Sequence, residues 1–187
     1  MALVLDGNGT MTVGNGDITG LDAGALPSTV IGAGAVLQVV STTKTDTFST
    51  AAATSFSDVT GLSVTITPTS STSKILVILS LNLAGTNGAG GAGYQFVRNS
   101  TPICIGDLSG SRPQASGGMA YIASQNDFTT ISGNFLDSPA TTSSTIYKVQ
   151  VWPVSSAFVN RTQNDTNAVQ IYNARTASTI TVMEIAA

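Results

Sequence analysis

Apolar side chains occupy every second position in several stretches of this chain, and this alternation constrains the fold more than any other feature of the sequence. In residues 61–68, Leu62, Val64 and Ile66 alternate with serine and threonine. A strand with this pattern buries one face of a sheet and leaves the other face in water. No stretch shows a sustained helical period, and strong helix formers are sparse. The alternation therefore predicts an all-β protein.

Residues 74–83 give the strongest strand signal. One face is apolar from Ile75 to Leu83, and Leu76 and Ile78 make the opposite face apolar at its start. A strand that is apolar on both faces is typical of the covered centre of a sheet, so this segment is the predicted central strand. Further strands are expected at residues 93–99, 117–124, 127–137, 144–152 and 178–186. Loops of very uneven length favour Greek-key or jelly-roll connections in a β-sandwich over an up-and-down meander.

The first 35 residues differ from the rest of the chain. Gly-Asn-Gly occurs at 7–9 and again at 14–16, between short apolar runs, and Asn-Gly is a strong signal for a tight hairpin turn. Such a small, glycine-rich segment cannot form its own core. We therefore interpret residues 1–35 as an assembly arm or short stem, and residues 36–187 as the sandwich domain. The arm residues expected to contact other chains are Leu3, Leu5, Met11, Val13, Ile18 and Leu21.

Low charge narrows the possible partners. Only 9% of the residues are charged, against roughly 25% in ordinary soluble domains, so we expect part of the neutral surface to be hidden against other subunits. The net charge of −3 and the scattered basic residues predict no nucleic-acid binding. No apolar run approaches a membrane span or a signal peptide, which predicts no membrane insertion and synthesis in a reducing cytoplasm. Cys104 has no partner for a disulfide and is expected to be a small buried side chain.

Catalytic signatures are weak. The chain has no histidine, which excludes Ser-His-Asp and Cys-His catalysis. The S-x-x-K of residues 71–74 leads into a strand rather than a helix, and the glycines of residues 88–93 precede a strand rather than the helix of a dinucleotide site. Two carboxylates brought together from distant strands remain an alternative that would indicate a glycosidase. We expect no catalytic residue, no cofactor and no metal ion.

Two groups of rare side chains, the arginines and the aromatic residues, each allow two interpretations. Arg112, Arg161 and Arg175 either contact carbohydrate or another subunit, or pair with Asp107 or Asp165, and we favour the pairing with a carboxylate. Several aromatic residues either form a sugar-stacking surface or anchor the core or an interface, as aromatic residues of sandwiches more often do. These are Tyr121, Tyr147, Trp152 and Tyr172.

The chain also resembles a family of marine and cyanobacterial bacteriophage virion proteins. The similarity lies in recurring phrases: "LVLDGNGTMTVGNGDITGL" and "ALPSTVIGAGAVLQVV" near the start, "GLSVTITPTSSTSKILV" in the middle, and "FLDSPATTSSTIYKVQV" and "RTASTITVMEI" later. The resemblance implies a homotrimeric β-rich module on the outside of a phage particle, with a jelly-roll-like head comparable to the tumour-necrosis-factor type. On this basis the residues expected near the trimer axis are Val30, Ile31, Val36 and Leu37.

Two functional hypotheses follow. The short segment before the sandwich favours a non-enzymatic protein that decorates or cements the capsid exterior, or a short head fibre. Its partners would be itself and the major capsid protein or other virion proteins. The alternative is the receptor-binding tip of a tail fibre that recognises a host surface glycan through exposed loops. The candidate receptor residues are Asn87, Arg161, Asn164 and Asp165.

Overall fold

The alternating segments become strands throughout the part of the chain that the structure, a computed structural model, describes: residues 32–88, 90–119 and 122–187. The predicted arm residues, and Val30 and Ile31 of the predicted trimer axis, lie outside these ranges. Residues 33–187 form one unit. Its elements are β1 (Val36–Lys44), β2 (Phe48–Thr50), β3 (Ser57–Ile66), β4 (Lys74–Gly85), β5 (Ala92–Arg98), β6 (Thr101–Ile103), β7 (Gly117–Met119), β8 (Thr129–Asp137), β9 (Thr145–Pro153), β10 (Ala157–Val159), the 3-10 turn η1 (Ile171–Asn173) and β11 (Ser178–Ile185).

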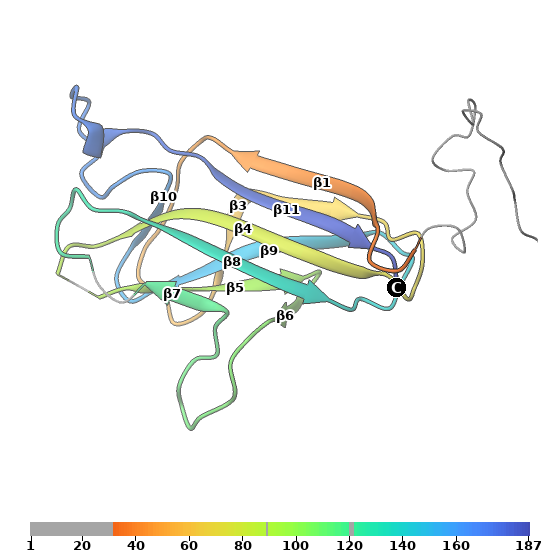
Figure 1. The fold of residues 1–187 in the computed structure, drawn as a ribbon. Helices are drawn as coiled ribbons and strands as arrows, with labels where there is room; N and C mark the ends of the chain where they lie inside the picture. Colours follow the sequence, from red (N-terminus) through yellow and green to blue (C-terminus); the bar gives the residue numbers. More distant parts are fainter. Residues whose placement is uncertain (1–31, 89, 120–121) are drawn as a thin grey trace, which may run out of the picture. The chain divides into compact units, whose positions relative to one another are not determined.

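The strands form two antiparallel sheets (Figure 1). Sheet 1 has the order β1-β11-β4-β10-β2, with β8 also paired to β4, and sheet 2 has the order β3-β9-β5-β6, with β7 also paired to β5. The long strands change sheet at every step along the chain, because β1, β4, β8 and β11 belong to sheet 1 while β3, β5 and β9 belong to sheet 2. This alternation is the winding of a jelly roll. The predicted all-β, jelly-roll-like sandwich is confirmed.

The core lies between the facing sides of the two sheets. Leu62, Val64 and Ile66 of β3 are buried, as their alternation predicts. Opposite them lie the inward-facing residues of β4, which are likewise buried from Ile75 to Leu83. Strand β4 pairs with β8 on one side and with β11 and β10 on the other, so the predicted central strand is confirmed.

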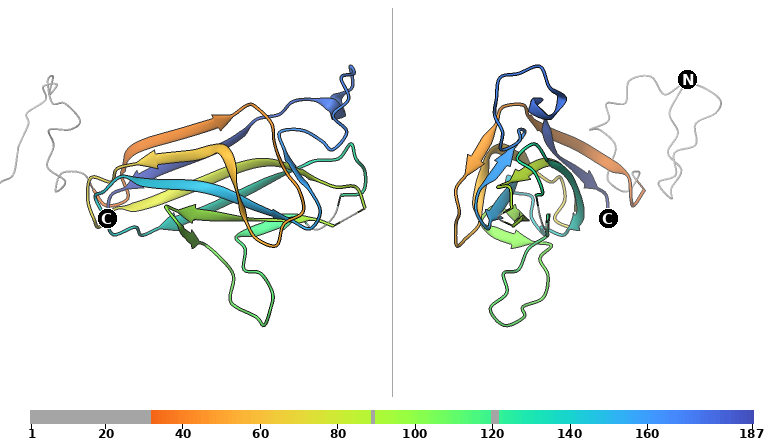
Figure 2. Two further views of the ribbon diagram at one scale, coloured as in Figure 1. Left: turned by 180° about the vertical axis from the view of Figure 1, so that it is seen from behind. Right: turned by 90° about the vertical axis from the view of Figure 1, so that its left-hand side faces the viewer.

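The two ends of the sandwich differ. The amide of Gly34 donates to the carbonyl of Ala186 over 2.8 Å, and the amide of Ala186 donates to the carbonyl of Ala35 over 2.9 Å, so the entry into β1 and the exit from β11 share one end. We call this the terminal end. The opposite end, which we call the loop end, carries the turn at residues 86–88 and the long loop of residues 160–177 (Figure 2).

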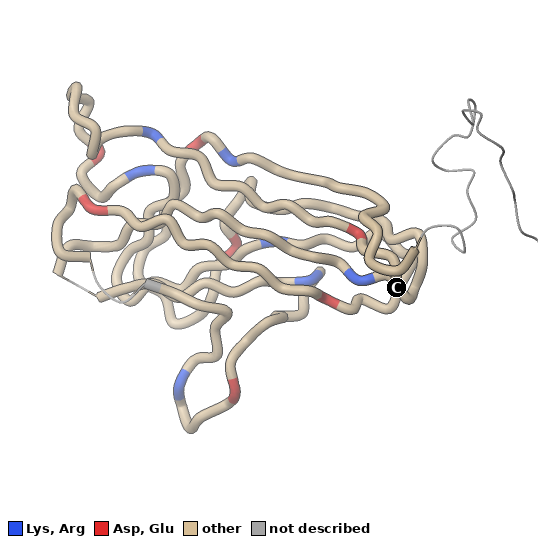
Figure 3. The backbone as a smooth tube through the Cα atoms, viewed as in Figure 1, with Lys and Arg blue, Asp and Glu red and all other residues tan. Residues whose placement is uncertain are grey.

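Charged residues are few and are spread along the unit (Figure 3). Several of them form ion pairs, such as Lys44 with Asp46 and Lys148 with Asp58. Cys104, expected to be buried, is half-buried and packs against the core. In the described ranges, no helix has the length and apolar character that crossing a membrane would need.

Candidate assembly face

The outer side of sheet 1 carries the side chains that alternate with the core positions of β1, β11, β4 and β8. Within the described strands, Lys74 at the terminal end of β4 is the only ionisable residue in this phase, and its ammonium donates to the Ser138 hydroxyl over 2.8 Å. We call the surface formed by the other side chains the neutral face. It consists of Val39, Ser41, Thr43, Leu76, Ile78, Ser80, Asn82, Thr130, Ser132, Asn134, Leu136, Thr179, Thr181 and Met183.

An apolar row crosses the neutral face near the terminal end. Val39 is paired in register with Met183, Met183 with Leu76, and Leu76 with Leu136. Side chains at directly opposed positions of neighbouring strands contact one another, so the row is a continuous apolar stripe. Val39 is 54% exposed and Leu136 is 53% exposed, while Leu76 and Met183 are half-buried. Ile78 extends the stripe towards the loop end.

Hydroxyl and amide groups occupy the rest of the neutral face, and several bond to one another. The Ser41 and Thr181 hydroxyls lie 2.8 Å apart, and the Thr130 hydroxyl donates to Asn82 Oδ1 over 2.6 Å. Asn82 Nδ2 donates to the carbonyl of Ala177 over 2.6 Å. Because these groups already have partners, another protein surface could cover them at a small desolvation cost.

The sequence signalled only part of this face. Leu76 and Ile78 were expected to be covered, but within the described residues Ile78 remains 37% exposed. Val39, Leu136 and Met183 were not among the candidate residues. An apolar residue at an outward position of an alternating strand is the pattern that would have identified all three.

Two of the predicted trimer-axis residues lie at the start of β1. Val36 is 53% exposed and is paired with Ile185 at the terminal end, and Leu37 is half-buried at the register shift between Val36 and Gln38. Both positions adjoin the end of the neutral face that carries the apolar row. Their contact with another subunit stays a prediction.

The structure brings the predicted receptor residues together at the loop end. The amide of Asn87 donates to Gln163 Oε1 over 2.7 Å, which joins the 86–88 turn to the loop that holds Arg161, Asn164 and Asp165. Asn164 Nδ2 donates to Asn126 Oδ1 over 2.9 Å.

Two of the three arginines pair with a carboxylate, which is the interpretation that we favoured. Arg161 lies 3.6 Å from Asp165 and 4.4 Å from the ring centroid of Phe158, and Arg175 also pairs with Asp165. The predicted pairing with a carboxylate is therefore confirmed for these two arginines. Arg112 instead donates to the Ser109 hydroxyl over 2.9 Å.

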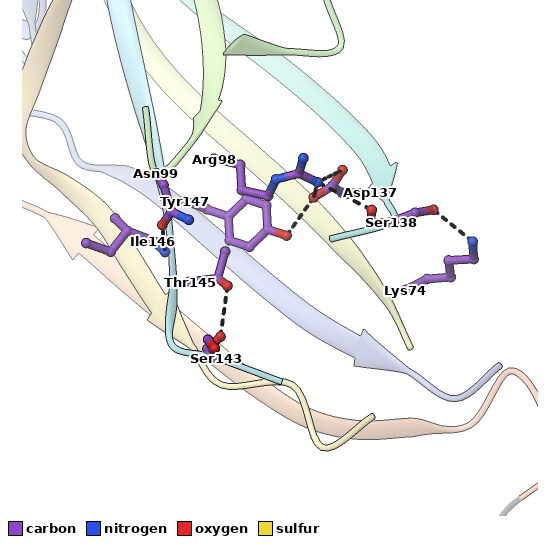
Figure 4. Close-up of polar contacts among 9 residues, drawn as sticks. All are labelled: Lys74, Arg98, Asn99, Asp137, Ser138, Ser143, Thr145, Ile146 and Tyr147. Carbon is purple, nitrogen blue, oxygen red and sulfur yellow. Dashed lines mark hydrogen bonds and ion pairs between the residues drawn. The ribbon is translucent and has the colours of Figure 1, made fainter. Parts of the chain in front are cut away.

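A polar cluster that the sequence did not signal joins the two sheets at the terminal end (Figure 4). Arg98 Nη1 of β5 donates to both carboxylate oxygens of Asp137 of β8 over 2.8 Å, and the Tyr147 hydroxyl of β9 donates to the same carboxylate over 2.7 Å. Burial, and then the Asp137 carboxylate, raise the pKa of Tyr147 well above its ordinary value. Asp137 is 5% exposed and Tyr147 is 1% exposed, so the cluster braces the sheets and is closed to a substrate.

Glu184 is a second buried carboxylate at the terminal end. It accepts hydrogen bonds from Gln38 Nε2 over 2.6 Å and from the amide and hydroxyl of Thr69, each over 2.7 Å. Burial pushes the pKa of Glu184 upward, but these hydrogen bonds outweigh it and hold the pKa below its ordinary value. Glu184 thus ties β11 to β1 and to the turn after β3. Residues 32–88, 90–119 and 122–187 contain no group of three or more Cys, Asp or Glu side chains that could hold a metal ion.

Comparisons with known proteins identify no family and find only distant structural similarity. No family model matches the chain, and no curated protein matches it. Among solved structures, the chain is similar to the structure of the infectious bursal disease virus Gx strain, with 14% identity and a TM-score of 0.39 over 80% of this chain and 38% of that one. It is also similar to a mutant VP2 protein of infectious bursal disease virus in T=1 particles, with 14% identity and a TM-score of 0.37 over 80% of this chain and 36% of that one. The chain therefore spans less than two thirds of either structure, and TM-scores this low carry no inference about function.

Proposed function

We propose that this chain is a non-enzymatic structural protein of a bacteriophage virion, made in the host cytoplasm and assembled as a homotrimer that decorates or cements the capsid exterior or forms a short head fibre. The observation that carries the proposal is the neutral face, which has a continuous apolar row and bonded hydroxyls, with Lys74 at its terminal edge as the one ionisable side chain of the outward phase in the described strands. Such a face suits other copies of the same chain packed around a shared axis, because a nearly uncharged surface brings few like charges together.

The proposed mechanism is burial of apolar surface between subunits. Covering the row formed by Val39, Met183, Leu76 and Leu136 would stabilise the assembly by roughly 25 cal/mol per Å² of apolar area removed from water. The arm would add strands to neighbouring sheets or to the shell, and several attachments per trimer would slow detachment. The resemblance of the sequence to phage virion proteins is the reason for placing this assembly on a phage particle.

The test compares two carboxylate substitutions at exposed apolar residues. Leu136→Asp places a charge in the apolar row, whereas Val169→Asp places the same charge on the long loop of the loop end, where Val169 is fully exposed. In sedimentation velocity we expect the unchanged chain and Val169→Asp to be trimeric and Leu136→Asp to be monomeric, because an unpaired buried charge is strongly disfavoured.

A monomeric unchanged chain, or a Leu136→Asp variant as trimeric as Val169→Asp, would contradict the proposed use of the neutral face. Deletion of residues 2–30 tests the arm separately. We expect this deletion to abolish attachment to particles, and unchanged attachment would exclude the arm from that role.

A second candidate is a receptor-binding tip, favoured by the loop end, where Asn87 is joined to the loop of residues 161–165. Its ligand would be a host surface glycan. Binding of the purified protein to host cells, lost when residues 161–167 are replaced and kept when Leu136 is changed, would favour this role over decoration.

A further inference from the structure

A groove runs along the outer side of sheet 2, away from the neutral face. It consists of two hollows of about 690 and 390 Å³ that share Trp152 and Pro113. The larger hollow is lined by Ala53, Gly91, Ala92, Gly93, Pro113, Gly118, Trp152 and Val154. The smaller hollow is lined by Thr54, Ser55, Phe56, Gln95, Pro102, Ile105, Pro113, Gln114 and Trp152. Two joined hollows suit an elongated ligand better than a single small ring.

The fold fixes the aromatic side chain at the centre of this groove. Trp152 of β9 lies opposite Gly93 of β5, and the side chains of Phe56 and Ala115 lie 3.7 Å from where a Cβ atom of residue 93 would be. The Trp152 indole N–H donates to the carbonyl of Ala53 over 2.6 Å, and the ring of Phe56 meets the indole edge-on with centroids 5.5 Å apart. The loop of residues 104–116, which projects from the sandwich in Figures 1 and 2, supplies Pro113 and Gln114 as one wall. The site is therefore preformed, as ligand grooves usually are.

The polar groups that line the groove are uncharged, and they offer free acceptors as well as donors. Gln95 Nε2 already donates to Gln150 Oε1 over 2.7 Å, and Gln114 Nε2 donates to the carbonyl of Gly106 over 2.6 Å. Within the described residues, no donor bonds to Oε1 of Gln95 or of Gln114. Neither hollow is lined by an ionisable side chain. The ligand that complements this lining is uncharged, offers hydroxyl donors and has an apolar face for the indole.

We propose that this groove binds an uncharged oligosaccharide segment, with one sugar ring packed on Trp152 and with sugar hydroxyls donating to Gln95 and Gln114. This is a binding activity separate from the assembly role, and it uses the opposite sheet. Acidic glycans are disfavoured because no cation lines the groove to pair with them.

A proline-rich peptide, the other ligand that aromatic grooves commonly take, fits less well. Such grooves bind proline-rich segments in an extended helix. Proline has no backbone N–H to donate to the two glutamine oxygens, and the indole N–H that would bind a peptide carbonyl is already bonded to Ala53.

Trp152 is the only tryptophan of the chain, so its fluorescence reports on this groove alone. The full-length protein is titrated with neutral probes (maltohexaose, cellohexaose, laminarihexaose, xylohexaose and mannohexaose), with oligoalginate as the acidic comparison and with a polyproline peptide. We expect at least one neutral probe to give a saturable change in emission, and its disaccharide to bind about tenfold more weakly because it spans less of the groove.

Matched glutamine substitutions identify the site. Gln114→Ala removes an acceptor of the groove, whereas Gln125→Ala removes an exposed glutamine that lines neither hollow. We expect Gln114→Ala to weaken binding about tenfold and Gln125→Ala to leave it unchanged. In calorimetry, Trp152→Phe should lose most of the heat of binding while its thermal midpoint shows that it is folded.

The proposal is overturned if no neutral probe changes the emission up to about 10 mM, a concentration at which even weak sugar sites are occupied. It is also overturned if only oligoalginate or the polyproline peptide binds, or if Gln114→Ala binds as tightly as Gln125→Ala. Sedimentation of the same samples reports assembly independently, so failure of this proposal and failure of the assembly role are distinguishable.

Discussion

Asn160 joins several separate segments of the chain at the loop end. Its side-chain Nδ2 donates to the carbonyls of Lys44 over 2.8 Å and Asp46 over 2.9 Å, and its Oδ1 accepts from the Ser178 hydroxyl over 2.7 Å. The residue is fully buried and has a φ of 62°, in the left-handed region that asparagine tolerates better than most residues. A single side chain thus fixes the end of β1 against the start of β11.

We expect Asn160→Ala to lower the free energy of unfolding by about 3 kcal/mol, because it leaves buried carbonyls without donors and places alanine in a strained conformation. Asn160→Gly loses the same hydrogen bonds without the strain, so it should be about 1 kcal/mol more stable than Asn160→Ala. Urea unfolding of the two variants measures the cost of the lost hydrogen bonds and the cost of the backbone strain. Equal stability of the alanine and glycine variants would show that the backbone conformation is not strained there.

Tyr147 predicts a loss of stability at alkaline pH. Its pKa is raised in the folded protein by burial and by Asp137, so the neutral phenol is favoured by folding. Its contribution is complete below the unfolded pKa of about 10 and is lost as pH rises above that value. Tyr147→Phe should therefore show a shallower fall in the free energy of unfolding above about pH 10.

At neutral pH the same Tyr147→Phe substitution should cost about 2 kcal/mol, because Asp137 loses a hydrogen-bond donor. Parallel stability profiles for the two proteins above about pH 10 would contradict the raised pKa.

At the scale of the strand, Gly133 shows how β8 accommodates the aromatic core. A Cβ atom at this position would lie 2.5 Å from the Tyr94 hydroxyl and 3.2 Å from Phe96 Cζ. The rings of Tyr94 and Phe96 pack edge-on with centroids 5.7 Å apart, so neither can move without disturbing the other. The glycine is required by this close approach of sheet 2 to β8.

We expect Gly133→Ala to destabilise the protein by about 2 kcal/mol through overpacking, although glycine-to-alanine changes in open space usually stabilise slightly. Ser132→Ala, at the adjacent outward position, should change stability by less than about 0.5 kcal/mol. Adding Tyr94→Phe to Gly133→Ala removes the hydroxyl that clashes, so the double variant should lose less stability than the sum of the single variants. Thermal unfolding of the four variants measures this coupling, and strict additivity would contradict the clash.

Alternation predicted the long strands, because a strand that packs against the core along its whole length needs an apolar side chain at every inward position. Residues 61–66, 74–83, 145–152 and 178–185 lie in strands as expected. Strands β2, β6 and β10 have three residues each, too few to show alternation, and they follow from pairing with neighbours rather than from their own sequence. Of the predicted strand at 117–124, the described part is a strand only over Gly117–Met119.

The site was less predictable than the fold. Arg98 and Asp137 are 39 residues apart in sequence and meet only because β5 and β8 end at the same end of the sandwich. The groove around Trp152 depends on where the loop of residues 104–116 lies, and loop sequence carries no periodic signal for that. Leu76 and Ile78 were recognisable because their strand is apolar in both phases.

At the scale of the whole molecule, assembly through the neutral face predicts that stability depends on protein concentration. A trimer that unfolds to monomers becomes more stable as concentration rises, because mass action favours the bound state. We expect the thermal midpoint of the unchanged chain to rise by several degrees over about a hundredfold increase in concentration. The midpoint of Leu136→Asp should not change. Scanning calorimetry at several concentrations measures this, and a constant midpoint for the unchanged chain would contradict assembly through this face.

The backbone hydrogen bond from Gly34 to Ala186 also makes the sandwich suitable for circular permutation. A short glycine linker from Ala187 to Ala33 would join two neighbouring ends, and new termini could be opened at Val169, which is fully exposed on the long loop. The permuted chain would begin and end at the loop end, and it would keep every strand of both sheets. A peptide fused to such a chain would then point away from the apolar row, which makes this unit a scaffold for displaying foreign sequences.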